Sequence, residues 1–275
     1  MGPPAASQHA SAVARRPDTW ASAPAGGVVI PFGEERSVAA SIAQPSFDAC
    51  SRWLELSLRY ASDAQVAKHA RVTAWEGTDE TAKSAALEWE FEACTQAIVA
   101  CGIALDALSA MLRTQLELPR WLIDKWRENR APHHTRITEI LSRALCLNPN
   151  ATKALQQHLS EILRFRDLAV GATTKADALI LHPELRTGVE WRFVYFRCEN
   201  ALMIVRATSR LIWELTTLGK PRDAELQKYI GALRSRIEAI PGYLAFATRP
   251  RDRDAPPAVS VSPVDALPAL LRQAG

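Results

Sequence analysis

The chain has 275 residues, of which 48% are hydrophobic and 23% charged, values that are ordinary for a soluble globular protein of one or two domains. Its 33 Lys and Arg against 30 Asp and Glu leave a formal net charge of +3, too balanced by itself to indicate a nucleic-acid-binding protein. No uninterrupted apolar run approaches the ~18 residues of a membrane span, so we expect no membrane association.

The N-terminal sequence and the cysteines predict a cytoplasmic protein. The segment MGPPAASQHASAVARRPDTW has no apolar stretch after a basic one, which predicts no signal peptide. An odd number of cysteines without a Cys-x-x-Cys pair favours neither a disulfide framework nor a zinc ribbon. We therefore expect a reducing compartment, with the cysteines as small core residues. They are Cys50, Cys94, Cys101, Cys146 and Cys198.

Both ends of the chain differ in composition from its middle. They are rich in Ala, Ser and Pro and have no helical periodicity, which predicts disordered tails at 1–45 and 248–275. The intervening residues, 46–247, are predicted to form one helical domain.

The first two predicted helices are long. The first starts at Ser46 or Asp48 and continues to about Thr73, with an apolar stripe at helical spacing. The second starts at Thr78 and ends near Pro119. Its stretch ACTQAIVACGIALDALSAML is almost entirely apolar, which is typical of the central helix of a bundle.

Further helices follow along the chain. They are predicted at 120–129, 135–146, 150–170, 189–218 and 223–239. Asn148-Pro149 is predicted to be a turn and 171–188 a loop, and no strand pair with hairpin chemistry is predicted. Four long helices joined in this way predict an all-α fold, an antiparallel four-helix-type bundle with extra short helices.

The motifs of several common enzyme classes are absent. The sequence has no GxxxxGK[ST], GxGxxG, GxSxG or HExxH pattern. A di-iron bundle would need Glu-x-x-His pairs on its helices, and none is present. We therefore expect neither a metal nor a cofactor.

One segment, residues 161–185, combines an apolar helix end with polar residues. The helix ends with Arg166-Asp167 before a loop that begins at Gly171. A guanidinium at this position can bind a phosphate in a forked geometry. The commoner interpretation is an Arg–Asp pair that ties the helix to a neighbour.

This segment resembles the core motif of the HEPN superfamily (higher eukaryote and prokaryote nucleotide-binding domains). Arg166 matches the Arg of the motif, Asp167 its polar neighbour and 168–170 the spacer, whereas Gly171 occupies the position of the His. By helix order the resemblance extends over about 50–217. It implies a helical bundle that pairs with a second copy across Arg–His sites.

The resemblance also implies a chemistry. HEPN ribonucleases are metal-independent, with the 2′-hydroxyl of RNA attacking its own phosphodiester, a His handling a proton and an Arg steadying the phosphate. Arg166 cannot act as the base because a guanidinium is not deprotonated in proteins. Asp167 beside it is held in its charged form. His182, in the following loop, is the candidate to replace the missing imidazole.

A basic surface around the third predicted helix is a candidate RNA contact. Its candidate residues are Arg120, Lys125, Arg127, Arg130 and Arg136, with Arg143 nearby. Trp121 and Trp126 lie among them and can stack on bases, although such a run is also typical of a solvated helix face. The spacing of Arg127 to His133 and His134 also fits the Arg–His motif, and we attribute this match to chance.

Three hypotheses follow. The first is a catalytically degenerate HEPN-like bundle that binds RNA or a protein partner through Arg166 and the basic surface. The second is a metal-independent endoribonuclease that uses Arg166 with His182 or with a residue of a partner. The third is a structural or adaptor bundle. The aromatic residues at 191–196 are expected to pack in the core, with a homodimer interface as the alternative.

Overall fold

A computed structural model describes residues 21–22, 29–30, 48–171 and 179–248, which fall into two units, 1–48 and 49–275. In the first unit, β1 (Ala21–Ser22) pairs antiparallel with β2 (Val29–Ile30), a ladder that the sequence does not predict. Apart from these strands and Thr248, the predicted tails lie outside the described residues.

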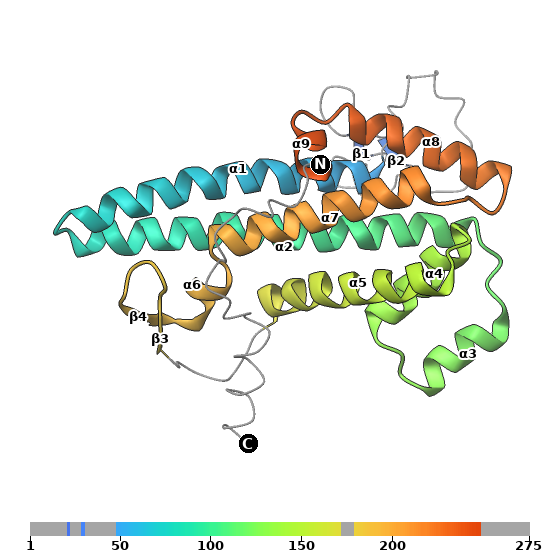
Figure 1. The fold of residues 1–275 in the computed structure, drawn as a ribbon, viewed down its shortest axis with the longest axis horizontal. Coiled ribbons are helices and arrows are strands. Elements are labelled where there is room, and N and C mark those ends of the chain that lie inside the picture. The colour runs from blue at the N-terminus through green and yellow to red at the C-terminus, as the bar shows by residue number, and fades with distance from the viewer. Residues whose placement is uncertain (1–20, 23–28, 31–47, 172–178, 249–275) are drawn as a thin grey trace, which may run out of the picture. The chain divides into compact units, whose positions relative to one another are not determined.

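The helical unit begins with a long hairpin of α1 (Ala49–Glu76) and α2 (Glu80–Thr114), coloured blue to green in Figure 1. Asp79, rather than the predicted Thr78, caps α2, because its carboxylate accepts from the amides of Thr81 and Ala82 at 2.9 and 3.2 Å. A carboxylate is also favoured there by the helix dipole. The helix ends at Thr114, before the predicted boundary at Pro119, and the amide of its C-cap residue Gln115 donates to the carbonyl of Leu112 at 3.2 Å.

Three helices follow, α3 (Arg120–Glu128), α4 (His133–Ala144) and α5 (Pro149–Val170). The expected turn at Asn148-Pro149 is the start of α5. The Asn148 side chain accepts from the amide of Ala151 at 2.9 Å. Proline is tolerated at the first helical position because the missing N–H has no partner within the helix.

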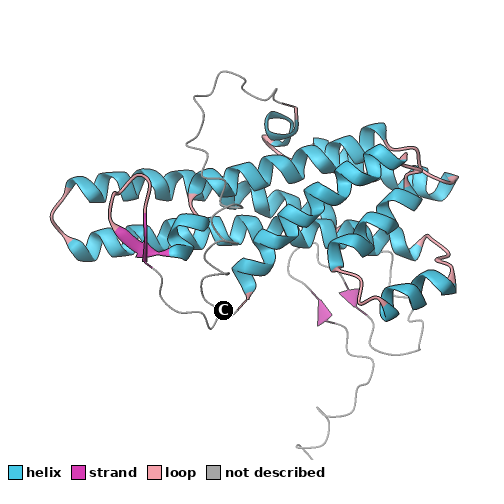
Figure 2. Cartoon of the chain, turned by 60° about the horizontal axis from the view of Figure 1, so that its bottom comes forward, coloured by secondary structure: helices cyan, strands magenta, loops and turns pink. Residues whose placement is uncertain are grey.

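A β-hairpin follows, which contradicts the prediction of a plain loop. It consists of β3 (Leu179–Leu181) and β4 (Gly188–Glu190), shown in magenta in Figure 2, with Ile180 opposite Val189. Its turn is organised by the buried His182 instead of by a two-residue Gly or Asn signal.

The predicted helix 189–218 is two helices, α6 (Trp191–Tyr195) and α7 (Cys198–Leu218). Where the helix is interrupted, between Tyr195 and Cys198, backbone amide and carbonyl groups form hydrogen bonds with side chains. The carboxylate of Glu90, in α2, accepts from the amide of Cys198 at 3.0 Å, and Asn200 donates to the carbonyl of Tyr195 at 2.9 Å. α8 (Ala224–Glu238) matches its prediction, whereas the short α9 (Tyr243–Ala247) was not predicted.

The long helices pack around one core, which confirms the all-α fold class. α2 contacts α1, α5 and α7, while α4, α8 and α9 cover the outside. α2 is long and apolar enough to cross a membrane by composition, but more than half of its apolar window is buried in the domain, and core helices pass the same test. All five cysteines are free and all except Cys146 are buried.

Candidate functional site

Arg166 ties α5 to α2. Its side chain lies against Gly102, where an added Cβ would be 2.5 Å from Cδ of Arg166. The Arg166 side chain is 15% exposed, and its guanidinium forms ion pairs with Asp106, on α2, and with Asp167 at 2.7 Å. Because two carboxylates compensate its charge, Arg166 fits the structural interpretation of the Arg–Asp pair better than a free phosphate clamp.

Asp106 connects Arg166 to a histidine. One of its carboxylate oxygens pairs with Arg166, and the other lies 2.7 Å from Nε2 of His133, the first residue of α4. We call Arg166, Asp106 and His133 the Arg–Asp–His cluster. Sequence analysis attributed the spacing between Arg127 and His133 to chance. One feature of the sequence nevertheless indicates that Asp106 has a charged partner. Asp106 is the single charged residue in the apolar stretch of α2, and such a charge is normally paired.

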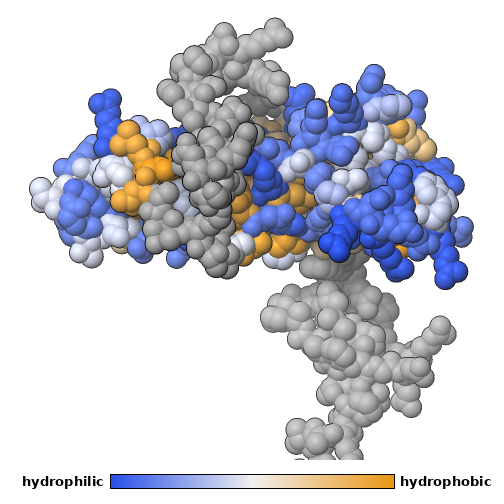
Figure 3. All heavy atoms as spheres, turned by 90° about the horizontal axis from the view of Figure 1, so that it is seen from below, coloured by the Kyte–Doolittle hydropathy of each residue, from blue (hydrophilic) through white to orange (hydrophobic). Residues whose placement is uncertain are grey.

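The Arg–Asp–His cluster lies at the edge of a groove of about 980 Å³ between α2, α3 and α4. Its apolar lining includes Ala110, Ile123, Trp126, Ala131, Ile137 and Ile140. Its charged or titratable lining consists of Arg113, Arg127, Arg130, Arg136, His133 and Asp106. We call this feature the basic groove. Figure 3 shows mainly hydrophilic side chains over the end of the domain that carries α3 and α4.

The arginines of the basic groove have few acidic partners. Among the described residues, Arg113, Arg130 and Arg136 form no ion pair, and Arg127 only approaches Asp124, at 3.8 Å on the surface. The single acid in the lining, Asp106, is already shared by Arg166 and His133. α4 also starts at this groove, and its N-cap, Pro132, has no side chain to accept from the first amides. The groove therefore has a positive potential.

The structure brings together three of the five predicted RNA-binding residues. Arg127, Arg130 and Arg136 line the basic groove, whereas Arg120 and Lys125 lie exposed on α3 outside its lining. Sequence analysis missed Arg113, because this residue belongs to the end of α2 and joins the others only through the tertiary fold.

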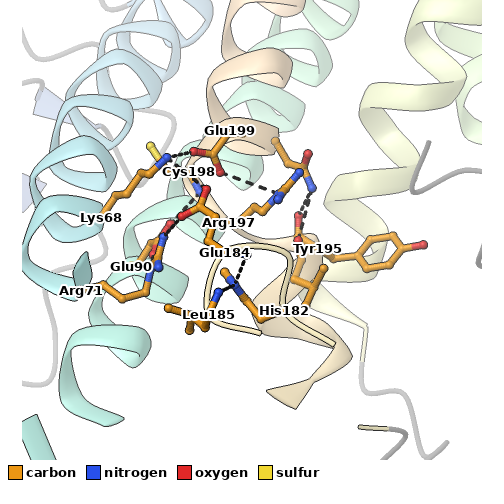
Figure 4. A network of polar contacts seen from close by, with 12 residues as sticks. Lys68, Arg71, Glu90, His182, Glu184, Leu185, Tyr195, Arg197, Cys198 and Glu199 are labelled. Atoms are coloured by element: carbon orange, nitrogen blue, oxygen red, sulfur yellow. Dashed lines mark hydrogen bonds and ion pairs between the residues drawn. The ribbon is translucent and has the colours of Figure 1, made fainter. Parts of the chain in front are cut away.

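His182 belongs to a different part of the molecule, so the expected pairing of His182 with Arg166 is not found. The ring is fully buried, and its Nδ1 accepts from the amides of Glu184 and Leu185, both at 3.2 Å. Glu184 in turn binds Arg71, which pairs with Glu90 on α2 (Figure 4). Glu90 and Asp106 are 16 positions apart on α2, about 24 Å along the helix axis.

The contacts around His182 hold the hairpin to the bundle. Arg71, on α1, is 1% exposed and pairs with Glu90, which is 2% exposed, and with Glu184 at 2.6 Å. Lys68 pairs with Glu184 at 3.2 Å and with Glu199 at the start of α7. We call this set, together with His182, the hairpin network (Figure 4). Burial opposes ionisation of Glu184, but the hydrogen bond from Arg71 and the charge of Lys68 outweigh it and lower the pKa of that carboxyl.

The aromatic residues near α6 pack inside the domain, as the first interpretation expected. Tyr195 and Phe196 are buried, and Phe193 and Phe196 both make edge contacts with Phe91. The homodimer interface suggested for these residues stays a prediction. Gly171, at the position of the motif's His, ends α5 with φ of −75°.

The chain matches no family model, no curated protein and no solved structure. The resemblance to the HEPN superfamily therefore stays a prediction.

Proposed function

We propose that the protein binds RNA through the basic groove. The observation that carries this proposal is the convergence of Arg113, Arg127, Arg130 and Arg136 on a groove whose one acid already has two partners. Guanidinium groups bind phosphate oxygens in a forked geometry, and unpaired ones do so without first breaking an ion pair. Phosphate contacts of this kind supply most of the affinity of a protein for a nucleic-acid backbone.

The apolar lining of the groove supports the same proposal. Trp126 is half-buried and lines the groove beside the arginines. An aromatic ring in a positive groove is typical of proteins that stack nucleic-acid bases. In this proposal Arg166 acts indirectly, because it neutralises Asp106 and so preserves the positive potential of the groove.

The proposal is tested by fluorescence anisotropy with a labelled RNA oligonucleotide. Changing Arg127, Arg130 and Arg136 to Gln together should weaken binding at least tenfold, because three phosphate contacts are lost. The matched control changes Arg206, Arg210 and Arg222 to Gln, which lowers the net charge equally at exposed positions outside the groove. Equal weakening in both triple variants would contradict the proposal, and no binding at low salt would favour the structural or adaptor hypothesis.

A second candidate function is metal-independent RNA cleavage, favoured by the hydrogen bond between Asp106 and His133. A carboxylate that accepts from Nε2–H leaves Nδ1 of a neutral ring as a proton acceptor. In this reaction Nδ1 of His133 takes the proton of a 2′-hydroxyl. The 2′-oxygen forms a bond to phosphorus, and the bond from phosphorus to the 5′-oxygen breaks. The products are a 2′,3′-cyclic phosphate and a 5′-hydroxyl, whose proton comes from water; the hydroxide left behind takes the proton from Nδ1 of His133 and restores the neutral ring.

This second function predicts RNA cleavage in the presence of EDTA. His133→Gln should abolish the cleavage, because a glutamine does not titrate, while RNA binding is retained. The measurement is product formation on a denaturing gel, with His134→Gln as the matched control on the neighbouring residue. Cleavage that survives in His133→Gln would exclude this residue as the base, and absence of cleavage in the native protein would leave binding as the function.

A further inference from the structure

The contacts of His182 allow only one protonation state of its ring. Nδ1 accepts hydrogen bonds from two backbone amides, those of Glu184 and Leu185. A nitrogen that accepts cannot carry a proton, so the proton of the neutral ring must be on Nε2. Nε2 is buried and has no hydrogen-bond partner among the described residues. A second proton would have to enter at Nδ1, where it would face two N–H groups.

The charges around the ring also oppose a second proton. Arg71 and Arg197 act against protonation of His182, while Glu184 and Glu199 favour it. The carboxylates are already engaged, because Glu184 binds Arg71 and Lys68, and Glu199 binds Lys68. Glu90, on α2, is likewise held by Arg71 and by the amide of Cys198.

We propose that the hairpin 179–190 is an acid-sensitive latch, which is released from α1 when His182 takes up a proton. Protonation removes the two hydrogen bonds that Nδ1 accepts within the turn, and one of them comes from the amide of Glu184. The backbone bonds between His182 and Thr187 and between Arg186 and His182 do not involve the ring. Glu184 joins the hairpin to α1 through its ion pairs with Arg71 and Lys68. When the turn opens, Glu184 moves away and both ion pairs are lost.

Little apolar packing opposes this release. Leu179 and Leu181 of β3 are exposed, whereas Val189 of β4 is buried. An apolar patch at the left of the molecule in Figure 3 lies where the hairpin is in Figure 1. Elements with few buried apolar contacts open at low free-energy cost, so the polar contacts of the hairpin network decide whether the hairpin stays closed.

The direction of the pH dependence follows from burial of the ring. Burial and then the charge of Arg71 lower the pKa of His182 to about 4, from an ordinary value of 6.5. Between about pH 4 and pH 6.5, His182 is therefore neutral in the closed hairpin and protonated in the open one. Its stability is fully present above about pH 6.5 and falls as the pH falls toward 4.

Hydrogen exchange followed by mass spectrometry tests the latch. Peptides covering 179–190 in the full chain are compared at pH 7 and pH 5, after correction for the intrinsic exchange rate. Protection of these amides should fall by roughly 20-fold at pH 5, the change that linkage gives for the two pKa values. Peptides from α5 should not change and serve as the internal reference.

His182→Asn is the matched variant. The Asn side-chain oxygen can accept from the same two amides but does not titrate, so the acid-dependent loss of protection should disappear. An equal loss in His182→Asn, or none in the native protein, would overturn the proposal. NMR titration of the native His182 ring gives a second test that needs no variant. The proposal requires a midpoint well below 6.5 that coincides with opening, and a midpoint near 6.5 with full protection contradicts it.

Discussion

Replacing Arg71 with methionine is expected to lower the free energy of unfolding by about 3–5 kcal/mol. The guanidinium of Arg71 and the carboxylate of Glu90 are both almost fully buried and pair with each other. Removing one partner leaves the other charge in a low-dielectric environment, which costs far more than the intact pair contributes. Glu90 cannot move to solvent without also losing the amide of Cys198, which it caps at the start of α7. Urea denaturation followed by circular dichroism measures the loss.

Two further variants separate the charge effect from a packing effect. Lys68→Met removes a partly exposed partner of Glu184 and Glu199 and should cost less than about 1 kcal/mol. Arg71→Met combined with Glu90→Gln should recover at least about 1 kcal/mol relative to Arg71→Met, because the uncompensated charge is gone and an oxygen acceptor remains for Cys198. A loss in Arg71→Met no larger than in Lys68→Met would contradict this account of the buried pair.

Changing Gly102 to alanine is expected to destabilise the protein by about 1–2 kcal/mol, although alanine is the better helix former. The new Cβ would lie 2.5 Å from Cδ and 2.9 Å from Cγ of Arg166, so this side chain has to leave its position. The displacement breaks the ion pair of Arg166 with Asp106 and frees Asp106 in the basic groove. The same variant should therefore also weaken RNA binding.

Gly231→Ala is the matched control for this change. Gly231 lies in the interior of α8, where an added Cβ meets nothing within 4 Å. It should stabilise the protein by about 0.5–1 kcal/mol, which is the ordinary helix-propensity gain. Thermal unfolding of both variants gives the comparison. Stabilisation by Gly102→Ala would show that the position of the Arg166 side chain does not require a glycine at 102.

The fold class and most helix positions could be predicted from the sequence because both depend on local patterns. Apolar spacing located α1, α5 and α8 within a few residues. The errors occur where a contact between distant residues decides the local structure. Glu90 caps α7 from another helix and so splits a continuous helical pattern at Phe196-Arg197. His182 shapes a hairpin turn from a buried position that no turn motif indicates.

The candidate site was predictable in part for the same reason. The arginines of α3 and α4 are close in sequence, so their clustering was visible. Arg113 and Asp106 join them only because α2 returns past α3 and α4 in the folded chain. Pairing of Arg166 with Asp106 and of Asp106 with His133 depends on three helices meeting. No spacing rule contains that information.

The salt dependence of RNA binding tests the basic groove most directly. For single-stranded RNA, the logarithm of the binding constant falls with the logarithm of salt concentration by about 0.7 per neutralised phosphate. If all four groove arginines contact phosphates, the slope of the native protein should be about −3, and the triple variant of Arg127, Arg130 and Arg136 should reduce it to about −1. The control triple variant of Arg206, Arg210 and Arg222 should keep the native slope. A slope that is the same in the native protein and in the groove variant would contradict the proposed site.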